Sequence, residues 1–191
     1  MRFHLAAAGV LAVLAMPFAA SAQPTPEGYL CCNLRTDGKW ISDSNYMESG
    51  KRVIPLGTAA KVTGYGRFRA FVDLGDNSKQ ALGNDYSRDL EMSAFATRYV
   101  VAEDPKKKLA ALPPKLREAI TSGRLAVGMS RDQVVMAVGY PITSENPRLD
   151  AKVLRFWLSS FQEFQVVFDD KGSVKEIVTF DPATRHAVVM E

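Results

Sequence analysis

The chain has 191 residues, of which 47% are apolar and 24% are charged, and its formal net charge is +3. This composition is typical of globular proteins and excludes a disordered, collagen-like or disulfide-dense chain. The two histidines, His4 and His186, are too few for a His-rich metal site and disfavour histidine-based acid–base catalysis. The length fits one domain or two small ones.

Residues 1–22 predict a secretory signal peptide. Arg2 provides a positive start, residues 5–18 form an apolar stretch, and residues 20–22 match a small-residue cleavage pattern. The apolar stretch is shorter than the ~20 residues that a membrane-spanning helix needs, although a retained membrane anchor is the alternative. We expect a mature chain that starts near Gln23, has no transmembrane span, and is periplasmic or associated with the outer membrane.

Charge is spread unevenly along the predicted mature chain. Residues 51–124 have 14 basic and 8 acidic side chains, whereas residues 23–50 and 125–191 are each slightly acidic. The basic middle segment favours an anionic neighbour such as lipid headgroups or cell wall. The alternative is a solvated face with a basic linker. An exported chain with so modest a charge is not expected to bind nucleic acid.

The two cysteines, Cys31 and Cys32, are adjacent in the sequence. Consecutive Cα atoms lie ~3.8 Å apart, below the ~4.4 Å lower edge of usual disulfide geometry. A disulfide between them is therefore expected to be strained and redox-active rather than a structural staple. The alternatives are two separate thiols, at least one of them buried, and pairing with another molecule or a metal. Cys31 and Cys32 are a candidate redox pair.

Residues 23–104 predict a β-rich domain. Alternating or apolar segments at 29–35, 40–46, 53–62 and 68–74 are separated by turn signals at 36–38, 64–66 and 75–77. Close spacing of short strands indicates a small, strongly bent barrel. Leu90, Ala94, Phe95 and Tyr99 recur at helical spacing and predict a short helix within 89–101.

The stretch 54–74 resembles the bacterial SH3-like barrel family. The resemblance lies in Pro55 and Gly57 before an alternating strand, and in the glycine break before the next strand. It implies binding of peptide or cell-wall material. The alternative for the aromatic rings is core or edge packing. Candidate binding residues are Trp40, Tyr46, Tyr65, Arg67, Arg69, Lys79 and Tyr86.

Residues 105–191 predict an α+β domain, after a junction at Asp104-Pro105 and the lysines 106–108. One helix begins at Pro113-Pro114 and ends at Gly123. A second helix follows Ser130 and ends at Gly139. Ser130 and Gln133 are expected to form a capping box at its start.

Three apolar segments, 153–159, 164–168 and 174–180, then predict strands, with a hairpin turn at 169–172. Two helices on one face of a three-stranded antiparallel sheet would bury the apolar faces of both layers.

The second domain resembles the outer-membrane assembly lipoprotein family BamE, also called SmpA/OmlA. That family shares a Gly-Met-Ser/Thr motif, then Gln-Val, Gly-x-Pro, an aromatic strand and a terminal hairpin. The matching residues are Gly128, Met129, Ser130, Gln133, Val134, Gly139, Pro141, Phe156, Trp157, Phe168, Asp169, Gly172 and Val174. The resemblance implies a role in outer-membrane assembly. This chain lacks a lipid-anchor cysteine after its signal and has an extra strand-rich domain.

No constellation of reacting groups is recognisable, so we expect a protein that is not an enzyme and that holds no cofactor or metal. The favoured function is binding or scaffolding in the cell envelope, including outer-membrane assembly or integrity. Its partners would be envelope proteins or cell wall. The alternatives are an SH3-type binder of cell wall or anionic surfaces, and a thiol redox or metal-sensing protein that uses Cys31 and Cys32.

Overall fold

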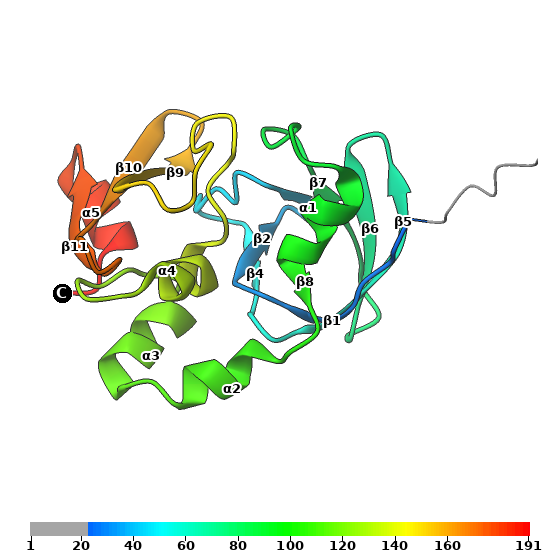
Figure 1. The fold of residues 1–191 in the computed structure, drawn as a ribbon, viewed down its shortest axis with the longest axis horizontal. Coiled ribbons are helices and arrows are strands. Elements are labelled where there is room, and N and C mark those ends of the chain that lie inside the picture. The colour runs from blue at the N-terminus through cyan, green and yellow to red at the C-terminus, as the bar shows by residue number, and fades with distance from the viewer. Residues whose placement is uncertain (1–22) are drawn as a thin grey trace, which may run out of the picture.

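The computed structural model describes residues 23–191, so the predicted signal peptide lies outside the described residues. The described chain is mixed α+β (Figure 1). It has two hydrophobic cores. One core is built on a curled six-stranded sheet and the other on a three-stranded antiparallel sheet. We call residues 23–104 the first half and residues 105–191 the second half.

The first half contains eight strands and one helix. Its six-stranded sheet has the order β3-β7-β6-β5-β1-β8, which places β8 at an edge, and β2 pairs with β4 separately. The elements are β1 (Glu27–Leu30), β2 (Leu34–Thr36), β3 (Trp40–Ser42), β4 (Arg52–Ile54), β5 (Ala59–Gly66), β6 (Arg69–Leu74), β7 (Lys79–Gly83), α1 (Met92–Tyr99) and β8 (Val100–Val101).

The alternation of side chains along the strands determines which residues form the first core. Ala70, Val72 and Leu74 of β6 point inward and are buried, while Phe71 between them is exposed. The helix α1 covers this core with Phe95, which has no exposed surface. The predicted short helix within 89–101 is therefore confirmed with narrower bounds.

Three predicted features of the first half are wrong in detail. The strand expected over 29–35 is two strands, β1 and β2, with residues 31–33 between them. The strand expected over 40–46 ends at Ser42, because Asp43 and Asn45 turn inward and are buried, and it pairs with β7 in parallel. Residues 64–66, where a bend was expected, continue β5, and the irregularity is a register shift between Val62 and Gly64.

The second half has four helices and three strands. Its strands form an antiparallel sheet of order β11-β10-β9. The elements are α2 (Pro105–Ala110), α3 (Pro114–Thr121), α4 (Arg131–Val138), β9 (Val153–Ser159), β10 (Gln162–Phe168), β11 (Val174–Thr179) and α5 (Pro182–Val188).

Side-chain caps begin α2 and α4. Ser130 and Gln133 form the predicted capping box of α4, and Gly139 follows its last turn. Asp104 accepts a hydrogen bond from the Lys106 N–H at 2.9 Å, so the segment after it is a helix rather than an extended junction. Within residues 23–191, no helix combines the length and apolar character needed to cross a membrane.

The helix α4 lies between the two cores (Figure 1). Val134 and Val138 are buried in the second core, whereas Val135 packs against the first. Leu56 crosses in the other direction, from the first half into the second core. The two halves therefore share a packed boundary, and that boundary holds the candidate site.

Candidate functional site

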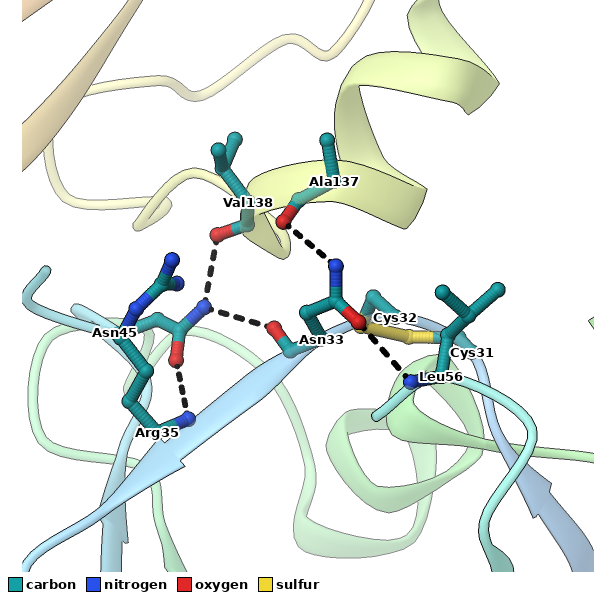
Figure 2. The surroundings of a disulfide bond; sticks show 8 residues. All are labelled: Cys31, Cys32, Asn33, Arg35, Asn45, Leu56, Ala137 and Val138. Carbon is teal, nitrogen blue, oxygen red and sulfur yellow. Dashed lines mark hydrogen bonds between the residues drawn. A yellow bond between two sulfur atoms is a disulfide. The ribbon is translucent and has the colours of Figure 1, made fainter. Parts of the chain in front are cut away.

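The boundary contains a polar seam, which we define as Asn33, Arg35 and Asn45 of the first half with the last turns of α3 and α4. The side-chain amide of Asn33 donates to the carbonyl of Ala137 at 3.2 Å (Figure 2). It also donates to the carbonyl of Ile120 at 2.7 Å. The last carbonyls of a helix have no partner within the helix. Asn33 therefore supplies donors, from the other half, to the ends of both helices.

Asn45 extends this seam (Figure 2). Its amide nitrogen donates to the carbonyl of Val138 at 2.8 Å and to that of Asn33 at 3.0 Å. Its Oδ1 atom accepts from the Arg35 N–H at 2.8 Å. All the polar atoms of this buried amide are thus used. A Cβ atom at Gly139 would lie 2.9 Å from the Asn45 amide nitrogen, which explains the glycine at this close approach.

Arg35 places a cation at the same helix ends. Its guanidinium lies against Gly123, whose φ is +69°, and a Cβ atom there would be 2.7 Å from Nη2. Burial lowers the pKa of Arg35 to about 10, so the group is still charged at neutral pH. A positive charge near helix C-termini is favourable, because the helix dipole is negative there.

A disulfide joins Cys31 to Cys32 immediately before Asn33 (Figure 2). Of the alternatives left open by the sequence, the structure contains the bond between neighbours. The Cys31 N–H donates to the carbonyl of Tyr99 at 2.9 Å, and the Asn33 N–H donates to that of Met136 at 3.1 Å. The pair is thus fixed between the first-half core and α4. Its use as a redox pair stays a prediction.

A groove with a volume of about 590 Å³ opens beside this disulfide, between β8, α2, α4 and the segment before β9. Its size and its position between two cores are typical of ligand sites. The groove is lined by Cys31, Val101, Ala102, Glu103, Pro105, Lys108, Arg131, Asp132, Val134, Val135, Met136, Tyr140, Leu149, Asp150 and Leu154.

Most of the groove surface is apolar, and its charges have two different roles. Arg131 donates to the carbonyls of Leu149 at 2.9 Å and Asp150 at 3.2 Å, and its guanidinium lies 3.9 Å from the centre of the Phe168 ring. Arg131 therefore holds the far wall in place. Glu103, Lys108 and Asp132 are exposed at the rim, where they are available to a ligand.

Of the predicted binding residues, Trp40 and Arg69 lie together. The Arg69 guanidinium is 3.5 Å from the centre of the Trp40 ring and 3.1 Å from a carboxylate oxygen of Asp85. Arg69 is thus already neutralised by an internal partner. Lys79 lies opposite Asp73 in the register of β6 with β7, at the other end of this pairing from Arg69.

Tyr46 and Tyr86 also lie together, and the hydrogen bond between their side chains raises the pKa of Tyr86. The N–H of Tyr86 donates to the buried carboxylate of Asp43 at 3.0 Å. Burial raises the pKa of Asp43, while its hydrogen bonds to the Tyr86 backbone and to Ser87 oppose the shift.

The remaining two predicted residues have different neighbours. The hydroxyl of Tyr65 donates to the carbonyl of Pro24. Arg67 and Arg88 both lie over the Phe68 ring, with 5.1 and 4.5 Å between each guanidinium carbon and the ring centre. The predicted residues therefore divide among several clusters, and their binding role stays a prediction.

Sequence reasoning missed the groove and the polar seam. Asn33 and Asn45 have no local pattern that marks them as boundary residues, since their acceptors are far away in the sequence. The groove residues come from four separate stretches, which no spacing rule connects. In residues 23–191, no group of three or more His, Cys, Asp or Glu side chains is arranged to hold a metal ion.

The chain matches no protein-family model, no curated protein and no solved structure. The resemblances to SH3-like barrels and to the BamE family therefore stay predictions. The groove and the disulfide on its wall are the features on which a function must be argued.

Proposed function

We propose that this chain is a non-catalytic binding protein of the bacterial cell envelope, and that it holds an extended segment of a partner protein in the groove between its halves. The observation that carries the proposal is the groove itself, about 590 Å³ in volume and lined mainly by apolar side chains. Pockets of this size at the boundary of two cores are the usual sites of binding.

The charges at the rim favour a polypeptide as the ligand. Lys108 is positive, whereas Glu103 and Asp132 are negative. A polyanion would meet two carboxylates, and an uncharged lipid chain would leave all three charges without a partner. A peptide offers backbone amides, apolar side chains and charges of both signs.

The position of β8 supports the same ligand class. It is the last strand of its sheet, and Val101 and the following Ala102 line the groove. An extended peptide that lies along a free strand edge gains backbone hydrogen bonds, while its side chains enter the adjacent pocket. The apolar side chain of Val135 on α4 would face such a peptide from the other wall.

The proposed location in the cell envelope rests on the secretory pattern of residues 1–22. An exported chain meets envelope proteins, and these are the partners we propose, including proteins of outer-membrane assembly.

Site-specific photocrosslinking in intact cells tests this proposal. A photoreactive residue at Ala102 lies in the groove, and the same residue at the exposed Ala59 of β5 is the matched control. We expect position 102 to crosslink a discrete envelope protein that position 59 does not. The purified partner segment should then bind the wild-type chain and lose at least about tenfold in affinity against Val135→Asp. Identical crosslinks from both positions, or unchanged binding by Val135→Asp, would refute the proposal.

A second candidate function, binding to an anionic surface, is favoured by Arg67 and Arg88. Both are exposed, and both stack on Phe68. Sedimentation with isolated cell wall tests it, with Arg67→Gln/Arg88→Gln compared with Lys171→Gln/Lys175→Gln in the second half. Salt-sensitive binding that only the first double variant loses supports this function. Absence of binding at low salt removes it.

A further inference from the structure

The disulfide is exposed on one side only. Cys31 lines the groove and is 8% exposed, whereas Cys32 is fully buried and does not line it. A reagent that enters the groove therefore meets Cys31 before Cys32. This asymmetry is a property of the folded chain, because the two residues are chemically identical and adjacent.

The bond does not act as a structural staple. A disulfide stabilises a fold mainly by closing a loop in the unfolded chain, and its effect grows with the number of residues enclosed. Cys31 and Cys32 enclose no residue between them. The segment also has backbone hydrogen bonds of its own, from the Cys31 N–H to Tyr99 and from the Asn33 N–H to Met136. Its place on a groove wall needs another explanation.

We propose that Cys31–Cys32 is a thiol–disulfide exchange site that is entered through the groove and that takes a dithiol as its substrate. The proposal goes beyond the binding role and does not depend on it, because a small dithiol also fits a groove of this volume. The dithiol has two sources that share this chemistry: a pair of cysteines in a peptide, or a small molecule with two thiols.

The exchange is a balanced two-electron step. A substrate thiolate attacks Sγ of Cys31, and a new sulfur–sulfur bond forms as the Cys31–Cys32 bond breaks. Cys32 leaves as a thiolate and takes a proton from solvent. The second thiolate of the substrate then attacks the substrate sulfur of the mixed disulfide, and Cys31 leaves and is protonated. The substrate becomes a disulfide, the protein pair becomes two thiols, and the two protons lost by the substrate equal the two gained by the protein.

The step is stoichiometric, with one dithiol oxidised per chain, so it fits a redox sensor rather than a turnover enzyme.

Paired serine variants test the asymmetry. Cys32→Ser leaves a thiol at Cys31 on the groove wall, and Cys31→Ser leaves the buried thiol of Cys32. We expect the native Cys32→Ser protein to react at least about tenfold faster with an aromatic disulfide reagent than native Cys31→Ser. In denaturant the two rates should be equal. Equal rates in the native state would overturn the proposal.

A second measurement uses the wild-type cysteines and is independent of how the serine variants fold. Reduction by dithiothreitol is followed in the wild type, in Ala102→Trp, which fills the groove, and in Ala94→Trp on the exposed face of α1. We expect Ala102→Trp alone to slow reduction at least about fivefold. A peptide with two cysteines, used at the same thiol concentration, distinguishes the two sources of the dithiol. If the peptide reduces the Cys31–Cys32 bond faster than dithiothreitol does, the substrate is a peptide. If the peptide reduces it more slowly, the substrate is a small molecule. Reduction that Ala102→Trp leaves unchanged would refute entry through the groove.

Discussion

The side-chain amide of Asn45 donates a hydrogen bond to the carbonyl of Val138, 93 positions further along the chain, at 2.8 Å. Val138 is the last residue of α4, so an early loop of the chain completes a late helix. Asn33 does the same for the end of α3 through Ile120. These contacts lead to the first two predictions.

Replacing Asn33 by Ala should destabilise the whole chain by about 3 kcal/mol, because it leaves the Ala137 carbonyl and the Leu56 N–H, both buried, without the side chain that bonds them. It also removes one of the donors to the carbonyl of Ile120. Urea unfolding followed by circular dichroism measures the change. The exposed Gln162→Ala is the control and should shift the free energy of unfolding by less than about 0.5 kcal/mol. An equal effect of the two substitutions would show that the seam contributes nothing to stability.

Gly123→Ala should destabilise more than Gly172→Ala. Both glycines have a similar positive φ, +69° and +77°, so both substitutions carry a backbone cost of about 1 kcal/mol. A Cβ atom at 123 also lies 2.7 Å from the Arg35 guanidinium, whereas at 172 the nearest neighbouring atom is 3.7 Å away. The difference between the two unfolding free energies therefore measures crowding against Arg35. Equal losses would mean that Arg35 moves aside freely.

Asp43 should make the chain less stable as the pH rises. Burial raises its pKa above the ordinary 3.8, so the protonated form is the one that folding favours. The stability it contributes is fully present below the ordinary aspartate pKa and is lost as the pH rises through the raised value. The unfolding free energy of the wild type minus that of Asp43→Asn should therefore decrease across this window.

The subtraction in this pH series matters. Exposed carboxylates such as Asp150 and Asp181 have lowered pKa values, because Arg148 and Thr184 respectively bond to them, and they act in the opposite direction. They are present in both proteins and cancel. A difference that stays constant from pH 3 to pH 8 would contradict the role given to Asp43.

Ser130→Ala should lower the free energy of unfolding by about 1 kcal/mol, since it removes the side-chain acceptor of the α4 capping box. Ser160→Ala, at the exposed β9–β10 turn, is the control. Thermal unfolding measures both. The helix α4 also forms a wall of the groove. If the loss of the cap loosens α4 as far as its last turn, amide exchange at Gly139 should become faster, and the groove ligand should then bind more weakly.

Local signals were enough to predict much of the second half. The capping box at Ser130, the stop at Gly139 and the alternation in β9 to β11 each depend on neighbouring residues. The helix α2 was missed although Asp104-Pro105 is a typical N-cap followed by a first-turn proline, because the lysines after it suggested a linker.

The rest depended on contacts between distant segments. The parallel pairing of β3 with β7 joins Trp40 to Ala81, and no turn signal between them specifies it. Asn33 and Asn45 are ordinary polar residues in the sequence and become boundary residues only after both halves have packed. The division of the predicted aromatics between Trp40 with Arg69 and Tyr46 with Tyr86 likewise follows from how the strands are arranged.

The side-chain donors at the ends of α3 and α4 come from the first half of the chain. This dependence restricts how the gene can be divided. A gene fragment that encodes residues 105–191 alone would produce an α4 whose Ala137 and Val138 carbonyls lose their side-chain donors, with Val135 uncovered. Exchange of one half between diverging copies of the gene would have to carry the asparagines and the glycines facing them together. We therefore expect the two halves to be exchanged only together.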